Sequence, residues 1–278
     1  MIKLAFFGTP ELTTAILDSL KAQNLSPALI VTTPDKPKGR KLVLTPPPAK
    51  VWADKNKIPC LQPEKLDESF VEKMTKENFD LFVVAAYGKI FPDKLINSAK
   101  FGTLNIHYSL LPKYRGASPI ESAILNGDAE TGVSIQKMQL KLDSGPIVAS
   151  EKFSVPKDVT APDLRDALNS IAAKILPKVI LEYVSGKIIT VSQDDKLASN
   201  CKKINKEDGL IDLAGDDILN DRKFRAYFDW PRTYFFDKDT RVIVSDAKLE
   251  NGVFKIKKVI PEGKKETLFE VFRKNSGE

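Results

Sequence analysis

The chain has 278 residues, enough for one large domain or two of ordinary size, and its 42% hydrophobic and 29% charged residues are typical of globular proteins. The net charge of +6 favours an anionic partner. The two cysteines, Cys60 and Cys201, stand alone, which excludes a disulfide framework and a cysteine-based metal site. The apolar run at the start of the chain is too short for a signal peptide. The longest apolar run, 81–87, is far shorter than the roughly 20 residues of a membrane span. We therefore expect a cytoplasmic protein.

Short apolar runs alternate with amphipathic segments in the first half of the chain. Taken in order, they predict a strand at 3–7, a helix at 11–22, a strand at 27–32, a polar, proline-rich loop to residue 48, a helix at 49–57, a strand at 59–62, a helix at 66–76, strands at 80–87 and 102–107, and a helix at 120–125. Within the strand predicted at 80–87, residues 81–87 are continuously apolar, as in a strand buried on both faces.

The second half begins with strands predicted at 133–140 and 146–155 and one long amphipathic helix at 160–185, closed by Gly186. A polar segment follows. Beyond it, short alternating runs predict strands at 233–236, 241–246 and 253–260. A group of aromatic and proline side chains precedes these strands. We expect it to pack between a helix and the strands, with nucleotide stacking as the less favoured alternative: Phe224, Tyr227, Phe228, Trp230 and Pro231.

Strands that alternate with helices predict an α/β fold with a doubly wound, mostly parallel sheet and an antiparallel addition at its end. We expect a first domain at 1–186, a linker at 187–205 and a small β-rich domain at 206–278.

One strand carries the most informative residues. Asn105 and His107 are two positions apart in the strand predicted at 102–107, so their side chains leave the same face. Asn donates a neutral hydrogen bond, His exchanges a proton near neutral pH, and Asp143 in a glycine-flanked turn can orient the imidazole. Such a trio suits acyl transfer to an amine, in which a carbonyl oxygen becomes an oxyanion. A single histidine is more often structural, but a polar loop follows this strand, where functional groups concentrate.

Several sequence motifs are absent. The chain has no G-x-G-x-x-G after its first strand and no G-x-x-x-x-G-K-[ST], which argues against a nicotinamide dinucleotide and a P-loop nucleotide. It has no G-x-S-x-G and no second histidine for a zinc site, so we expect no metal.

The catalytic segment of the folate-dependent formyltransferases resembles two parts of this chain, NIHYSLLPKYRGASPI at 105–120 and LDSG at 142–145. The branch of this family that acts on methionyl-tRNA is similar in four further segments: FFGTPELTTAIL at 6–17, VTTPDKPKGRKLVLTPPPAK at 31–50, VVAAYGKI at 83–90 and LNGDAETGVSIQKM at 125–138. The resemblance covers roughly residues 1–205. It implies a Rossmann-like formyltransferase domain, and for 206–278 a shortened barrel of the OB type that binds tRNA, because relatives carry a longer one.

The resemblance also implies a reaction and its residues. The donor is 10-formyltetrahydrofolate, the acceptor is the methionine amine of initiator tRNA, and the catalytic residues are Asn105, His107 and Asp143. The residues implied for folate binding follow two strands, and small residues among them let backbone groups approach a flat ring: Ala85, Ala86, Tyr87, Gly88, Ile90, Ser109, Leu110, Leu111 and Pro112. From the residues alone, close packing between helix and sheet is the favoured role of the two alanines.

Four basic residues lie within six positions of the proline-rich loop: Lys36, Lys38, Arg40 and Lys41. Such a cluster is commonly just solvated, but its match to the tRNA-contacting insertion of the family implies phosphate contacts.

Two other functions remain open: a formyltransferase that acts on a sugar nucleotide or other small amine, and a non-catalytic RNA-binding protein. The basic loop and the second domain argue against the first, and the intact trio argues against the second. We expect the enzyme to be a monomer.

Overall fold

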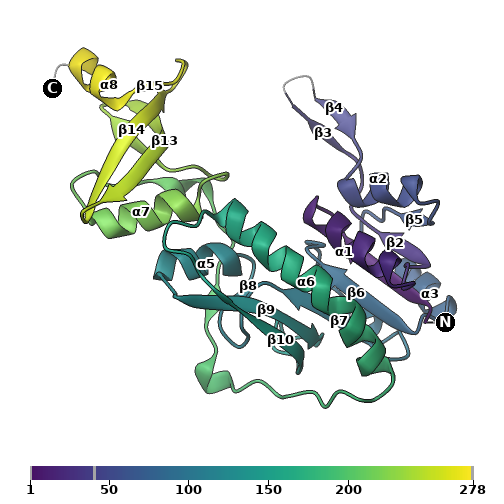
Figure 1. Cartoon of the computed structure of the whole chain (residues 1–278). Helices are drawn as coiled ribbons and strands as arrows, with labels where there is room; N and C mark the ends of the chain where they lie inside the picture. Colours follow the sequence, from purple (N-terminus) through teal and green to yellow (C-terminus); the bar gives the residue numbers. More distant parts are fainter. Residues whose placement is uncertain (1, 40–41, 277–278) are drawn as a thin grey trace. The chain divides into compact units, whose positions relative to one another are not determined.

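A seven-stranded sheet organises the larger part of this computed structural model, which describes residues 2–39 and 42–276 (Figure 1). The strand order is β10-β9-β7-β6-β1-β2-β5. In chain order these strands are β1 (Leu4–Gly8), β2 (Leu29–Val31), β5 (Cys60–Leu61), β6 (Leu81–Ala85), β7 (Thr103–His107), β9 (Glu130–Lys137) and β10 (Ile147–Ser154). Strands β5, β2, β1, β6 and β7 pair in parallel, whereas β9 is antiparallel to β7. The predicted mostly parallel sheet with an antiparallel addition is confirmed.

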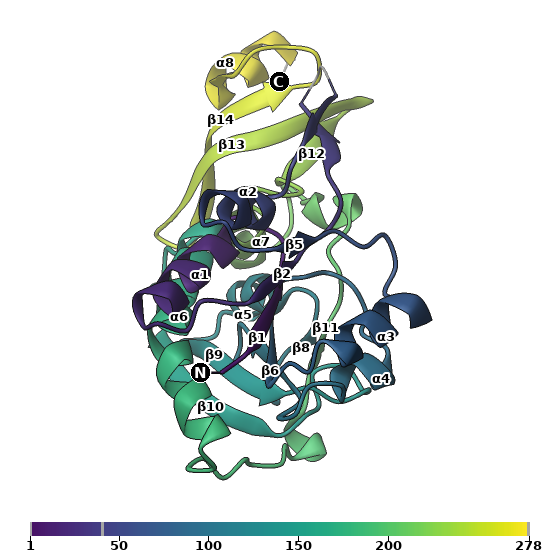
Figure 2. The same ribbon diagram turned by 90° about the vertical axis from the view of Figure 1, so that its right-hand side faces the viewer.

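Helices cover both faces of this sheet (Figure 2). The helices of the sheet region are α1 (Leu12–Ala22), α2 (Pro48–Lys55), α3 (Glu68–Lys76), α4 (Asp93–Ile96) and α6 (Ala161–Val184). Helices α3 and α4 pack on one face, where Phe70, Met74 and Leu95 join a core with side chains of β1, β2 and β6. On the other face α1 lies against α6, and Ser19 Oγ of α1 donates a hydrogen bond to the Ala173 carbonyl of α6 at 2.6 Å.

The proline-rich segment predicted as a loop contains a small hairpin. Strands β3 (Lys36–Lys38) and β4 (Val43–Thr45) pair antiparallel and project beyond α2 (Figure 1). Each strand has three residues, and nearly every side chain is exposed. A strand is recognised in a sequence by alternating apolar and polar residues, which arise when one face of the strand is buried. This hairpin has no buried face, so the sequence did not predict its strands.

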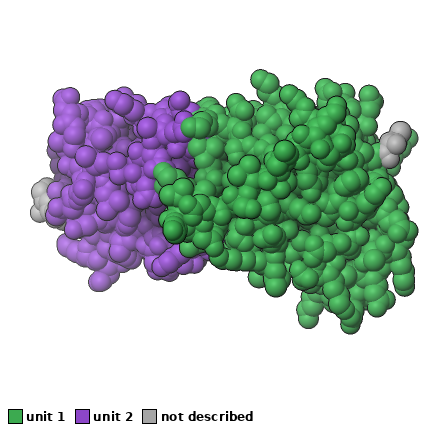
Figure 3. Space-filling view, turned by 90° about the horizontal axis from the view of Figure 1, so that it is seen from below, with its two compact units in different colours: residues 1–115, 132–153, 166–200 green, residues 116–131, 154–165, 201–278 purple. Residues whose placement is uncertain are grey.

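Two compact units divide the chain (Figure 3). Unit 1 contains residues 1–115, 132–153 and 166–200, and unit 2 contains residues 116–131, 154–165 and 201–278. The division predicted from the sequence is different, because it places one continuous domain on each side of a linker at 187–205. It stays a prediction about folding domains.

Unit 2 contains a four-stranded antiparallel sheet, in the order β12-β13-β14-β15. Its strands are β12 (Tyr234–Asp237), β13 (Thr240–Glu250), β14 (Val253–Pro261) and β15 (Thr267–Leu268), and its helices are α5 (Pro119–Asn126), α7 (Asp217–Ala226) and α8 (Phe269–Ser276). The predicted β-rich carboxyl-terminal part is confirmed. The short remaining elements of the chain are β8 (Arg115–Gly116), β11 (Asn200–Cys201) and the 3₁₀ turns Asp195–Leu197 and Lys206–Gly209.

The aromatic group before these strands is only partly packed as predicted. Phe224 and Tyr227 are buried, and Phe224 belongs to the core of unit 2 with Val242 and Val259. The exposed fractions of Phe228 and Trp230 are 45% and 49%, so the prediction of core packing is wrong for these two. Among the residues that the structure describes, no helix combines the length and apolarity needed to cross a membrane.

Candidate active site

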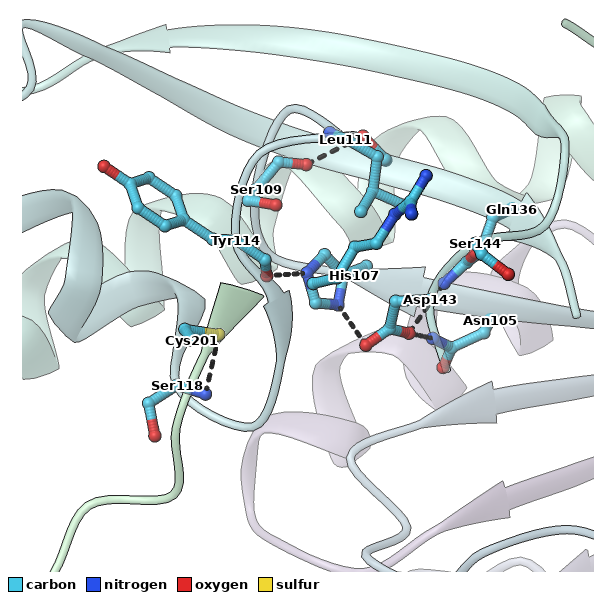
Figure 4. Close-up of polar contacts among 12 residues, drawn as sticks. Asn105, His107, Ser109, Leu111, Tyr114, Ser118, Gln136, Asp143, Ser144 and Cys201 are labelled. Atoms are coloured by element: carbon cyan, nitrogen blue, oxygen red, sulfur yellow. Dashed lines mark hydrogen bonds and ion pairs between the residues drawn. The ribbon is translucent and has the colours of Figure 1, made fainter. Parts of the chain in front are cut away.

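Asn105 and His107 lie at the carboxyl end of β7, in the middle of the sheet. In open α/β sheets this edge is where ligands bind. Their side chains leave the same face of the strand and approach Asp143, which comes from the loop between β9 and β10 (Figure 4). The structure therefore brings together the three residues that the sequence predicts as catalytic.

His107 is held from both sides of its ring. Its Nε2 is 2.8 Å from the carbonyl oxygen of Tyr114, and because a carbonyl can only accept, Nε2 carries the hydrogen. Its Nδ1 faces Asp143 Oδ2 at 3.6 Å. The exposed fraction of the imidazole is 6%. This geometry fixes the plane of the ring and turns Nδ1 toward the Asp143 carboxylate (Figure 4).

Asp143 also receives hydrogen bonds at its other oxygen. Oδ1 accepts from Asn105 Nδ2 at 3.3 Å and from Gln136 Nε2 at 2.7 Å. An amide nitrogen has two hydrogens, so Asn105 keeps a second N–H for a ligand while it contacts Asp143. The carboxylate thus orients the Asn105 amide and lies beside Nδ1 of the imidazole.

The backbone of the Asp143 loop adopts an unusual conformation. Asp143 has φ +47°, in the left-handed region, which a residue other than glycine rarely occupies. Gly145 cannot be replaced without a shift, because an added Cβ would lie 1.8 Å from the Lys137 carbonyl oxygen. Its N–H donates to Gln136 Oε1 at 3.2 Å. Gln136 therefore holds both the side chain of Asp143 and the backbone that follows it.

Sequence reasoning missed Gln136 and a second glutamine, Gln193. Gln136 lies directly opposite Asn105 in the antiparallel pair of β7 and β9, and this register would have identified it. Gln193 donates to the carbonyl oxygens of Asp143 at 2.9 Å and Gly145 at 2.7 Å. It lies in the segment predicted as a linker, where no sequence pattern distinguishes it.

The segment predicted to bind the pteridine begins where β6 ends, at Ala85. Ala86 and Gly88 have φ of +47° and +78°, so the chain turns sharply here. Both are exposed, as is Ile90 at 90%. Tyr87 is different, because its ring is buried against Phe7, and burial raises the pKa of its hydroxyl to about 12. Only its backbone can face a ligand.

The other predicted folate contacts lie in the loop after β7. Ser109 and Leu111 are buried, and Leu110 and Pro112 are half-buried. Ser109 Oγ donates to the Lys113 carbonyl at 2.6 Å, and the Leu111 N–H donates to Ser134 Oγ at 3.0 Å. These bonds fix the loop that follows His107 but leave little of Ser109 for a ligand.

The predicted RNA contacts lie on the hairpin of β3 and β4. Lys36 and Lys38 are exposed, and the other two, Arg40 and Lys41, lie outside the described residues. Three exposed apolar residues continue the hairpin, with exposed fractions of 60–70%: Leu42, Val43 and Leu44. The described part of the hairpin thus combines positive charge with apolar side chains.

Comparison with known proteins identifies the family. Residues 2–180 match the model of the formyl transferase family. The chain belongs to this family. Among the relatives of this formyl transferase, the methionyl-tRNA formyltransferase of Halalkalibacterium halodurans is 41% identical over 236 residues, which are 84% of this chain and 74% of that protein. That of a Geobacillus species is 42% identical over 237 residues, with the same coverage.

Solved structures of formyltransferases share the fold at low sequence identity. An N-formyltransferase from Helicobacter canadensis, in complex with folinic acid and dTDP-3-aminofucose, has a TM-score of 0.69 at 19% identity and covers 90% of this chain and 89% of its own. The methionyl-tRNA formyltransferase from Clostridium thermocellum has a TM-score of 0.64 at 17% identity and covers 94% of this chain and 99% of its own.

Proposed function

We propose that this formyl transferase moves the formyl group of 10-formyltetrahydrofolate to the α-amine of methionine on initiator tRNA, for translation initiation. The observation that carries the proposal is the convergence of Asn105, His107 and Asp143 at the end of β7 in a chain 41% identical to a methionyl-tRNA formyltransferase. Folate derivatives are the donors of the family, and the initiator tRNA is the partner.

The role proposed for Asn105 follows from its free N–H. When the amine attacks the formyl carbon, a C–N bond forms and the formyl oxygen becomes an oxyanion. An amide N–H that Asp143 holds in place stabilises this charge without reorganisation. Such a donor typically contributes about 10²–10³ in rate. When the intermediate collapses, the bond from the formyl carbon to N10 of the folate breaks, and N10 takes up a proton.

The role proposed for His107 is proton transfer or assistance at the same oxygen. Tyr114 fixes the hydrogen on Nε2, so Nδ1 is the nitrogen that exchanges a proton with the reacting groups. The Asp143 carboxylate, 3.6 Å from Nδ1, stabilises the imidazolium when that proton arrives. The attacking amine loses one proton overall, and the His107–Asp143 pair accepts this proton.

Binding of the two substrates completes the proposal. We assign folate binding to the segments at 85–90 and 109–112, with Tyr87 acting through its backbone because its ring lies in the core. We assign phosphate contacts to Lys36, Lys38, Arg40 and Lys41, on the basic proline-rich insertion. The residues at 206–278 are the second proposed tRNA contact. We propose a monomer that works in the cytoplasm.

The experiment that tests the function mixes the protein with 10-formyltetrahydrofolate and methionyl initiator tRNA. Formyl-methionyl-tRNA is the expected product, detected after release of the amino acid. A parallel reaction with an amino-sugar nucleotide tests the alternative of a small-amine substrate, because the trio could formylate either amine. Formylation of the sugar nucleotide but not of the tRNA would replace the proposed acceptor, and formylation of neither would contradict the function.

A further inference from the structure

A segment that follows α6 runs beside the Asp143 loop. We call residues 191–195 the strap. Its first residue, Val191, forms a two-way backbone bridge with Ile147, with both N–O distances at 2.8 Å. Two residues later, Gln193 reaches the backbone of the Asp143 loop, and Asp195 contacts Lys141 at 3.1 Å at the start of the same loop. The strap therefore holds the loop from residue 141 to residue 147.

Gln193 makes the central contacts of the strap. Its Nε2 donates to the carbonyl oxygens of Asp143 at 2.9 Å and Gly145 at 2.7 Å, so both amide hydrogens are used. Its Oε1 accepts from Arg115 Nε at 2.9 Å. The side chain is fully committed to these groups, which leaves it a single orientation.

Arg115 anchors the strap. Its side chain is 5% exposed, and Nη1 donates to Asp195 Oδ1 at 2.7 Å. The hydrogen bond from Arg115, followed by that from Lys141, lowers the pKa of Asp195, so its carboxylate stays ionised at working pH. A buried guanidinium fixed on both sides is a rigid support for Gln193.

The Asp143 loop needs such a support. Few non-glycine residues adopt a left-handed conformation, and it persists where the surroundings hold it in place. Gln136, on β9, forms hydrogen bonds with the side chain of Asp143 and the N–H of Gly145. Gln193, on the strap, donates hydrogen bonds to the carbonyl groups of Asp143 and Gly145. Removal of the Gln193 donors would free the loop to relax and carry Asp143 away from His107.

We propose that Gln193, held by Arg115, is a positioning residue that fixes the backbone of Asp143 and thereby the alignment of Asp143 with His107. This inference rests on the proposed function for its kinetic test, but not for its spectroscopic test. Gln193 touches no reacting atom. It acts on the formyl transfer through Asp143.

The kinetic test uses Gln193→Glu, which keeps the size of the side chain and an oxygen facing Arg115 but replaces the amide donors with oxygen. A misplacement of about 1 Å at a catalytic group costs about 10²-fold in rate. We therefore expect kcat to fall roughly 10- to 100-fold while the KM values for donor and tRNA stay nearly constant. Ser192→Ala is the matched control, because this exposed residue lies in the same strap.

A double-mutant cycle separates positioning from general loss of structure. If Gln193 acts through Asp143, Gln193→Glu should have almost no further effect on kcat in an Asp143→Asn background. A similar loss in both backgrounds would overturn the inference, as would a change confined to KM. The wild-type reaction is measured first, so failure of the proposed function is recognised before any variant is interpreted.

The spectroscopic test uses the fact that His107 is the only histidine of the chain. Untagged protein labelled with ¹⁵N in the imidazole gives one Nδ1 signal and one Nε2 signal. Gln193→Leu adds no charge, and we expect it to shift the Nδ1 signal, which faces Asp143, while Ser192→Ala leaves it unchanged. An Nδ1 signal identical to wild type in Gln193→Leu overturns the inference, whatever the kinetics show.

Discussion

In the proposed mechanism, the single residue Asn105 combines two tasks. One N–H contacts Asp143 Oδ1 at 3.3 Å, and the other is available to the formyl oxygen. A neutral donor suits this position, because a positive one would compete for the Asp143 carboxylate on which the imidazole also depends.

Asn105→Ala should therefore lower kcat about 10²–10³-fold, the usual loss of one oxyanion donor, with little change in the KM for tRNA. Steady-state formylation of methionyl-tRNA measures both constants. Asn97→Ala is the control, since Asn97 is exposed at the end of α4. Near-normal turnover in Asn105→Ala would show that the oxyanion is stabilised elsewhere.

Cys60 gives a second prediction at this scale. Burial raises the pKa of its thiol to about 11, and nearby Lys50 offsets only part of this effect. Since the thiolate is the reactive form, the fraction that reacts grows tenfold per pH unit until about pH 11. In Cys201→Ser protein, iodoacetamide labelling of Cys60 should still rise between pH 9 and 10, where a small-molecule thiol of pKa about 8.5 levels off. A plateau by pH 9 would contradict the assigned pKa.

The candidate site shows which residues a sequence can reveal. Asn105 and His107 were predictable because a strand places residues two apart on one face, and Asp143 because of its glycine-flanked turn. The direction of a side chain at a strand end was not predictable, and Tyr87 points into the core beside Phe7. Gln193 was not predictable either, because it contacts the Asp143 loop only in the folded chain, and nothing in the sequence links two segments so far apart.

At the scale of elements, burial explains what the sequence revealed. Strand β6 is buried along its whole length, and its continuous apolar run predicted it. Helices α7 and α8 were missed. Helix α7 has six polar or charged residues among ten and buries only two apolar side chains, Phe224 and Ala226, so its apolar stripe is too narrow to show a helical period. The hairpin of β3 and β4 was missed for the related reason that nearly all of it is exposed.

The hairpin of β3 and β4 carries the prediction at this scale. If Lys36 and Lys38 contact tRNA phosphates, replacing both with Ala should weaken tRNA binding and reduce the log–log salt slope by about 1 for each lost contact. Binding measured at several salt concentrations gives the slope. The KM for the folate donor should change much less than the tRNA affinity, because both side chains are exposed and neither belongs to the predicted pteridine segments.

The matched control removes the same charge from another surface. Lys73→Ala with Lys76→Ala takes two exposed lysines from α3, and the salt slope should then stay close to that of wild type. An equal change in both double variants would mean that only net charge matters. An unchanged slope in the hairpin variant would make the hairpin a bystander and would favour the small-amine acceptor.

At the scale of the whole molecule, the chain alternates between its two units. It passes from one to the other at 115/116, 131/132, 153/154, 165/166 and 200/201. Helix α6 contributes to both units, because the boundary at 165/166 lies inside Ala161–Val184. Unfolding of unit 2 alone would remove the first turn of α6, and the unit 2 segments 116–131 and 154–165 are each joined at both ends to unit 1. We therefore expect the two units to unfold together.

The two tryptophans of the chain make this expectation testable. Trp52 lies in unit 1 and Trp230 in unit 2, so Trp230→Phe and Trp52→Phe proteins each report one unit by fluorescence. Phe254→Ala empties part of the unit 2 core, where Phe254 is 9% exposed, and should cost about 3–5 kcal/mol.

In denaturant titrations, Phe254→Ala should lower the midpoint reported by Trp52 as much as that reported by Trp230, because cooperative unfolding distributes a local loss over the whole structure. Phe236→Ala is the control, since Phe236 is 54% exposed and makes one edge-to-face ring contact, with Tyr234, so its loss should cost much less than that of Phe254. If only the Trp230 midpoint moves, the units unfold separately. The single boundary predicted at 187–205 would then describe the folding domains better than the alternation of the two units.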